Sequence, residues 1–225
     1  MRILFVFLFF TLISCTKSGC KDRWDNSRDG WSPLMLAIYN DDPDDYTKLI
    51  EQNVDLNFVS ESPNTNWNLT AIEVAIFKDN DSAVKKLLLT GKISNPEKYF
   101  MQACGQNSAS TVDLLIKYGA NPNEILDNGY SVLMMSASFG SLEVLESLLK
   151  NGANPNQKRN TDGMTALMLA TSNGEPKKVK LLLEYGAKKD TKDLNGETAL
   201  DNVKYLNQDE KISKKTIDEL RMLLK

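Results

Sequence analysis

Apolar residues recur along the chain at helical spacing, in two kinds of segment that alternate. The first kind begins with Ser or Thr and continues with small and aliphatic residues, at residues 32–37, 70–75, 131–136, 165–170 and 198–203. The second kind places aliphatic residues shortly before a glycine, at residues 86–91, 113–123, 147–156 and 181–187. This spacing predicts amphipathic helices, so each pair of segments is expected to form a pair of helices.

The two kinds of segment keep a fixed distance, which chance similarity would not produce. Nineteen residues separate the members of each of these pairs: Leu34 and Asn53, Ile72 and Gly91, Phe100 and Gly119, Leu133 and Gly152, Leu167 and Gly186. Residues 98–103 match the first segment poorly and are recovered only by this register. The chain therefore contains an internal repeat, and such repeats indicate a stacked architecture.

Residues that begin and end helices stand at the segment boundaries. The Ser or Thr that opens each first segment is expected to cap a helix, because its hydroxyl can accept a bond from an unpaired N–H. Pro33, Pro43 and Pro176 stand at predicted helix starts, where no N–H is needed. The glycine that ends each second segment suits a left-handed backbone, and Asn53 substitutes for it in the first repeat. Asn-Pro-Asn at 121–123 and 154–156 is interpreted as turn chemistry.

The predicted helices have apolar faces that only stacking can bury. These faces comprise Leu34, Ala37 and Ile38; Val144, Leu145, Leu148 and Leu149; Val179, Leu182 and Leu183; and, in a final helix at 216–224, Ile217, Leu220 and Leu224. The connections between repeats differ in length. The connection after Asn53 is long and predicts an elongated turn, whereas the one after Gly91 is short and predicts a missing turn with a kink near residues 92–98.

The first segments resemble the Thr-Pro-Leu-His-x-Ala signature of the ankyrin repeat over about residues 27–225. The resemblance implies an all-α solenoid of about six helix-turn-helix units with short β-turn fingers, in a domain of residues 28–225. The third repeat diverges, and the last is expected to cap the stack. The family's signature histidine is replaced by Met35, Glu73, Met101, Met134, Met168 and Asp201. Because methionine supplies no hydrogen-bond donor, we expect looser coupling between repeats.

The resemblance also implies a binding surface, since ankyrin-repeat proteins bind other macromolecules, usually proteins, with their fingers and concave face. Two sets of positions face this groove in the family: Trp31, Leu69, Tyr130 and Met164; and Tyr39-Asn40, Phe77-Lys78, Ser138-Phe139 and Ser172-Asn173. An aromatic stripe across the first four repeats would comprise Trp31, Tyr39, Phe77, Tyr130 and Phe139, with Trp67 in the long finger. Such a stripe favours a partner surface. Single rings covering gaps between helices are the alternative.

The N-terminal residues have the pattern of an export signal. Arg2 precedes an apolar run at residues 3–13 that would span only about 16 Å as a helix, too short for a bilayer. Residues 1–14 therefore predict a signal peptide. Leu-Ile-Ser-Cys at 12–15 resembles the lipobox of bacterial lipoproteins, which implies acylation of Cys15, a membrane anchor and a flexible tether over 15–27. An ordinary signal peptide with a chance cysteine is the alternative.

Composition and charge exclude some functions. The chain has no histidine, which excludes Ser-His and Cys-His pairs and imidazole metal sites. Its net charge of −3 disfavours binding to nucleic acid. Cys20 and Cys104 could pair in an oxidising compartment, but a small inward helix position favours Cys104 as a free, buried thiol. The aspartates within residues 41–45 favour helix capping over a cation site.

These patterns predict a monomeric, non-catalytic protein-interaction module that needs no cofactor or metal. Its expected location is the inner or outer membrane of a bacterial envelope, where it binds another protein as an adaptor, a protector or an inhibitor, including an immunity factor against a secreted toxin. The alternative is an anchored periplasmic enzyme or small-ligand binder on the same scaffold. A closed pocket lined by two or more carboxylates would favour that alternative.

Overall fold

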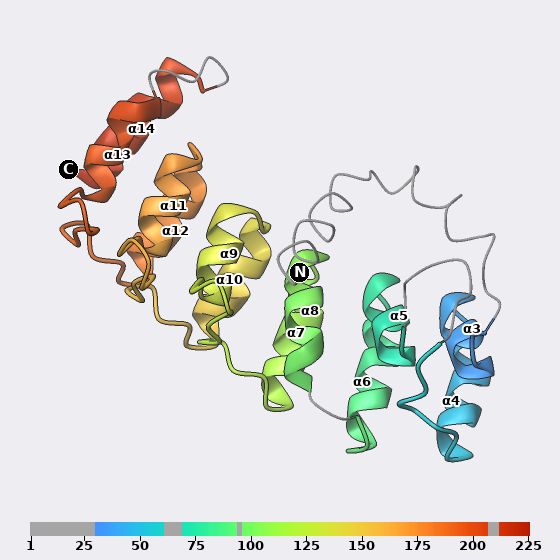
Figure 1. Ribbon diagram of the computed structural model, residues 1–225. Coiled ribbons are helices and arrows are strands. Elements are labelled where there is room, and N and C mark those ends of the chain that lie inside the picture. Colours follow the sequence, from blue (N-terminus) through green and yellow to red (C-terminus); the bar gives the residue numbers. More distant parts are fainter. Residues whose placement is uncertain (1–29, 61–68, 94–95, 207–211) are drawn as a thin grey trace. The chain divides into compact units, whose positions relative to one another are not determined.

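The computed structural model describes residues 30–60, 69–93, 96–206 and 212–225. Within these ranges, twelve helices form six helix-turn-helix pairs in two compact units, Met1–Ala120 and Asn121–Lys225. The first unit contains α3 (Pro33–Tyr39), α4 (Pro43–Glu51), α5 (Ala71–Phe77), α6 (Asp81–Leu89), α7 (Pro96–Gly105) and α8 (Ala109–Lys117). The second contains α9 (Val132–Ser138), α10 (Leu142–Lys150), α11 (Ala166–Ser172), α12 (Pro176–Glu184), α13 (Ala199–Leu206) and α14 (Lys214–Leu224) (Figure 1). The predicted all-α repeat fold is confirmed.

The predicted capping residues begin the first helices. The Ser and Thr hydroxyls accept backbone N–H groups three residues ahead: Ser32 from Met35 (3.3 Å), Thr70 from Glu73 (3.4 Å), Ser131 from Met134 (3.2 Å), Thr165 from Met168 (3.4 Å) and Thr198 from Asp201 (3.3 Å). The residues that follow the second helices have positive φ, 66° at Gly91, 107° at Gly119 and 63° at Asn53. Both sets of predictions are confirmed.

The core lies between neighbouring repeats within each unit. First helices pack on first helices and second helices on second, as in α3 against α5 and α4 against α6, or α9 against α11 and α10 against α12. The predicted inward residues of α3, α10, α12 and α14 are buried, except that Leu183 is only half-buried. The last helix was predicted over 216–224 but begins two residues earlier, at Lys214, because Ser213 is its N-cap. Each pair thus buries its apolar face only against its neighbours.

At two of the positions where the family's signature has histidine, this chain has a carboxylate that stabilises the start of a helix. Glu73 accepts hydrogen bonds from the N–H and the hydroxyl of Thr70, at 2.7 and 2.8 Å. Asp201 accepts the same pair from Thr198, at 2.9 and 2.7 Å. Each carboxylate therefore supports its own helix through a reciprocal cap.

Asparagine side chains connect neighbouring repeats at the base of the fingers. Asn123 donates through Nδ2 to the Gly152 carbonyl (3.2 Å) and accepts the Asn154 N–H through Oδ1 (2.7 Å). Asn156 makes the same two bonds one repeat later, to the Gly186 carbonyl (2.9 Å) and from the Lys188 N–H (2.8 Å). These bonds supply hydrogen bonding between repeats that the methionines cannot. The interpretation of Asn-Pro-Asn as turn chemistry was correct but incomplete.

Candidate functional site

In several repeats, the first helix ends at an equivalent residue. The C-cap residue and the residue before it are the groove positions predicted from the sequence. Each helix stops after two turns, with C-caps Asn40 for α3, Lys78 for α5, Phe139 for α9 and Asn173 for α11. The next residue or two turn the chain toward the second helix. The side chains of the C-cap residue and of the residue before it therefore project from equivalent positions in these repeats.

In the first unit, three predicted positions from two repeats meet. The rings of Trp31 and Tyr39 lie edge to face with their centroids 5.5 Å apart. The Lys78 ammonium lies 4.4 Å from the centroid of the Tyr39 ring. Edge-to-face rings and a cation over a ring face are both favourable arrangements. This part of the predicted surface is thus a preformed aromatic and cationic cluster.

The other predicted residues of the first unit are less prominent. Leu69 and Phe77 are half-buried. Ser60 and Leu69 close the base of the long finger, because the Ser60 N–H donates to the Leu69 carbonyl (2.8 Å) and the Leu69 N–H to Ser60 Oγ (3.0 Å). Trp67 lies outside the described residues. Trp31 also lines a mainly apolar hollow of about 470 Å³ with Pro33, Val54 and Phe58 among its neighbours.

In the second unit, Arg159 joins the finger residues Tyr130 and Met164. Its guanidinium lies 4.1 Å from the Tyr130 ring centroid and donates to the Met164 sulfur at 3.6 Å. Two guanidinium nitrogens donate to Asp162, Nε to Oδ1 at 2.8 Å and Nη2 to Oδ2. The Asp162 Oδ1 also accepts the Met164 N–H at 3.1 Å. Arg159 therefore contacts both Tyr130 and Met164, while Asp162 holds its guanidinium in place.

Sequence reasoning missed Arg159 and Asp162, although their spacing gave a signal. An aspartate or asparagine stands two residues before each of these finger positions, and its side chain accepts the N–H of Tyr130 (from Asn128, 3.1 Å) or Met164 (from Asp162). The hydrogen bonds from Arg159 lower the pKa of Asp162, although partial burial alone would raise it. The same bonds raise the pKa of Arg159. The pair is charged at neutral pH and holds the finger in one conformation.

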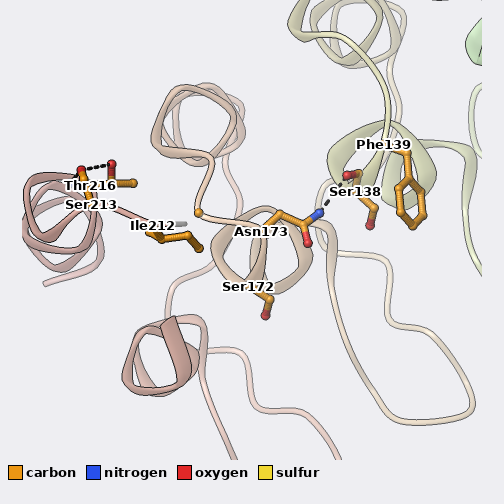
Figure 2. A pocket seen from close by; sticks show the side chains of 8 residues that line it. Ser138, Phe139, Ser172, Asn173, Ile212, Ser213 and Thr216 are labelled. Carbon is orange, nitrogen blue, oxygen red and sulfur yellow. Dashed lines mark hydrogen bonds between the residues drawn. The ribbon is translucent and has the colours of Figure 1, made fainter. Parts of the chain in front are cut away.

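Phe139 lines a hollow of about 700 Å³ on the second unit (Figure 2). The lining residues are Ser138, Phe139, Ser172, Asn173, Gly174, Ile212, Ser213 and Thr216. Four of them are groove positions predicted from the sequence, and the other residues come from the turn after α11 and the start of α14. More than half of the Phe139 side chain is exposed, 57%. This hollow is open to solvent and brings predicted groove positions of two repeats together.

The lining of both hollows bears on the enzymatic alternative. Asp55, at the hollow beside Trp31, is the one carboxylate among the residues that line either of them. In the part of the chain that the structure describes, no three His, Cys, Asp or Glu residues are grouped as metal ligands.

Asp42 caps α4 by accepting the Asp45 N–H at 3.0 Å, as predicted. Cys104 is buried, which raises the pKa of its thiol to about 12. Cys15 and Cys20 lie outside the described residues.

The structure thus places the predicted aromatic residues in separate groups. Trp31 and Tyr39 form one cluster, Tyr130 belongs to the Arg159 cluster, and Phe139 lines the hollow. A single stripe across four repeats stays a prediction. No helix among the described residues is both long and apolar enough to cross a lipid bilayer.

Comparison with known proteins supports the repeat assignment. Residues 100–193 match the family described as ankyrin repeats (3 copies). The chain also resembles the crystal structure of an ankyrin repeat domain from Acinetobacter baumannii AYE, with a TM-score of 0.65 and 24% identity, over 85% of this chain and 95% of the other. No curated protein matches the sequence significantly. The chain has the ankyrin-repeat fold, and ankyrin repeats are generally non-enzymatic protein-protein interaction modules.

Proposed function

We propose that this chain is a non-catalytic module that captures a partner protein with the side chains at the ends of its first helices and with the adjacent fingers. The observation that carries the proposal is the hollow at Phe139, because residues chosen from the sequence as groove positions line it. Exposed aromatic side chains are enriched in the energetically important centres of interfaces. The cluster of Trp31, Tyr39 and Lys78 adds a second such surface.

The proposed setting is a bacterial envelope membrane, inner or outer, to which lipid on Cys15 tethers a monomeric chain. It rests on the apolar run that ends in Leu-Ile-Ser-Cys. The proposed role is that of an adaptor, a protector or an inhibitor, including an immunity factor, of an envelope protein. Enzymatic function is the weaker candidate, because the hollow at Phe139 has no carboxylate in its lining.

Affinity capture tests the partner surface. The full chain with a C-terminal tag is expressed in bacteria, crosslinked briefly and purified, and bound proteins are quantified by mass spectrometry. Combined Trp31→Ala, Tyr39→Ala and Phe139→Ala changes should reduce the captured partner at least tenfold. A matched control replaces Leu89 and Met222, exposed apolar residues outside both hollows, by alanine. Equal capture by the wild type and the aromatic variant would refute the proposed surface.

A separate experiment tests the anchor. Cells are grown with a radiolabelled fatty acid, and membrane and soluble fractions are compared for the wild type and Cys15→Ser. The variant should lose the label and leave the membrane fraction, while Cys20→Ser should retain both. Unchanged label and fractionation after Cys15→Ser would contradict the lipid anchor without affecting the partner surface.

A further inference from the structure

The turn between α9 and α10 differs from the equivalent turns of four other repeats. In those repeats, the second residue after the first helix has a left-handed backbone, with φ of 56° at Asp41 and Asp79, 59° at Asn107 and 69° at Gly174. Its N–H donates to the carbonyl three residues back at 2.9 to 3.2 Å, and the following N–H donates to the carbonyl five residues back at 2.9 to 3.1 Å. These bonds satisfy the last carbonyls of the helix.

Gly140 is the second residue after α9, yet it does not adopt this left-handed conformation. Its N–H donates to the Ser136 carbonyl, four residues back, at 3.0 Å, and not to the Ala137 carbonyl. The C-cap Phe139 also differs, with φ of −132° where the C-cap Asn40 has −79°. Because glycine adopts the left-handed conformation at no steric cost, the residue type at position 140 does not explain the difference.

Side chains of the following repeat bind the last carbonyls of α9 instead. The Lys178 ammonium, on α12, donates to the Ala137 carbonyl at 3.4 Å, and Asn173 Nδ2 donates to the Ser138 carbonyl at 2.8 Å (Figure 2). Lys178 is buried, and a buried ammonium needs an acceptor to offset its lost hydration. The C-terminal end of a helix also favours a cation. Lys178 therefore binds the carbonyl that the usual turn would use.

The observed turn has local costs that the left-handed turn would avoid. A Cβ at Gly140 would lie 2.8 Å from Ser136 Cα, so only glycine fits at this position. The buried Ser136 hydroxyl has no hydrogen-bond partner among the described residues, which costs free energy. The four repeats with the left-handed turn have alanine at the position equivalent to Ser136, namely Ala37, Ala75, Ala103 and Ala170. Departures from a repeated local pattern are expected where a protein has a functional element.

From these observations we propose that the α9–α10 turn is a two-state element controlled by Lys178. In the lysine-bound form, the ammonium binds the Ala137 carbonyl and the Gly140 N–H binds the Ser136 carbonyl. In the left-handed form, the Gly140 N–H takes the Ala137 carbonyl and Lys178 is released. The φ of Phe139 then approaches that of the other C-caps, and the ring points in another direction because its Cβ turns with φ.

The switch changes how an exposed aromatic side chain is presented, since 57% of Phe139 is accessible. A ligand that contacts Phe139 in only one form would shift the turn toward that form. The two forms are a property of the chain itself, and only their effect on binding rests on the proposed function.

NMR spectroscopy of the full chain tests the two-state turn, with the φ of residue 140 measured from scalar and residual dipolar couplings. Lys178→Met should raise the ratio of the left-handed form to the lysine-bound form at least tenfold. Gly140→Asn should adopt the left-handed form, because its Cβ excludes the other form and Asn107 has this conformation at the equivalent position. Lys180→Met, which changes a lysine with a 68% exposed side chain, is the matched control and should retain the wild-type turn.

Three outcomes would overturn the two-state turn: a left-handed Gly140 in the wild type, an unchanged φ at residue 140 in Lys178→Met, or a bond from Lys178 to the Ala137 carbonyl that persists in Gly140→Asn. If Gly140→Asn does not fold, Lys178→Met decides alone.

Affinity capture separates this inference from the proposed function. Lys178→Met should change the amount of captured partner at least threefold, although Lys178 is buried. Unchanged capture by Lys178→Met, with loss of capture by the aromatic variant, would overturn the control of Phe139 and leave the partner surface standing. Equal capture by the wild type and the aromatic variant would refute the partner surface, while the NMR result still decides the two-state turn.

Discussion

The substitution Asn156→Ala tests whether asparagines couple neighbouring repeats. It removes the bond from Nδ2 to the Gly186 carbonyl (2.9 Å) and the bond from the Lys188 N–H to Oδ1 (2.8 Å). A net hydrogen bond contributes about 0.5–1.5 kcal/mol, and both bonds are near solvent, so we expect a loss of about 1–2 kcal/mol in unfolding free energy. The loss should fall on the repeats that follow Asn156.

Hydrogen exchange measured by mass spectrometry locates the effect, and urea unfolding measures its size. In Asn156→Ala the amide of Lys188 should exchange faster, together with the peptides of α13. The matched control is Asn154→Ala, which loses only the bond within its own turn, from the Asn156 N–H at 3.0 Å. Equal exchange and equal stability of the two variants would refute the coupling role, as would an effect confined to residues 154–156.

Three further predictions concern charged and buried groups. Lys178 is buried at a position where the preceding repeat has Val144, and burial lowers its pKa from the usual 10.5. The Lys178 ammonium donates to the Ala137 carbonyl at 3.4 Å, a long bond that methionine would give up. Lys178→Met should nevertheless raise stability at pH 7, and the gain should shrink as pH rises toward 10.5, where the unfolded chain also loses the proton; thermal unfolding at a series of pH values checks this. Arg159→Ala should raise the pKa of Asp162 and lower stability by about 1 kcal/mol above pH 4. As the pH falls through the native pKa of Asp162, that deficit should disappear, and an unchanged NMR titration of Asp162 would contradict the assignment. Native Cys104 should resist a disulfide reagent at pH 8 and react only as the chain unfolds, because burial raises its pKa to about 12. Rapid reaction of a chain with both Cys15→Ser and Cys20→Ser, in which Cys104 is the remaining thiol, would count against this when it occurs without denaturant.

The fold was predictable because the same helix-capping and helix-ending residues recur at the same spacing in successive repeats. Most repeats have a capping hydroxyl, an apolar face and a left-handed residue after the second helix at constant spacing, so the register of a divergent repeat follows from its neighbours. Phe100 illustrates this, since its repeat lacks the signature yet is buried at the expected register. The start of α14 was predicted two residues too late because the apolar pattern begins only at Ile217, whereas the helix is capped by Ser213 ahead of it.

The site was predictable in position but not in chemistry. The register identified Phe139 and Asn173, because it depends only on where a helix ends. It could not show that Arg159 covers Tyr130, since that contact joins the fingers of two repeats. Nor could it show that Asn123 and Asn156 bridge to the next repeat. Contacts between repeats depend on which side chains of neighbouring repeats come close in space, and the sequence pattern within one repeat does not show this.

Site-specific photocrosslinking shows whether a partner protein binds at the surface around Phe139. A photoreactive phenylalanine analogue is placed at position 139, at position 39 or, as the control, at position 222, and cells that express the full chain are irradiated. We expect one partner adduct from position 139, a weaker or equal adduct from position 39, and none from position 222. An adduct from position 222 alone, or the absence of any adduct at position 139 when the partner is present, would contradict it.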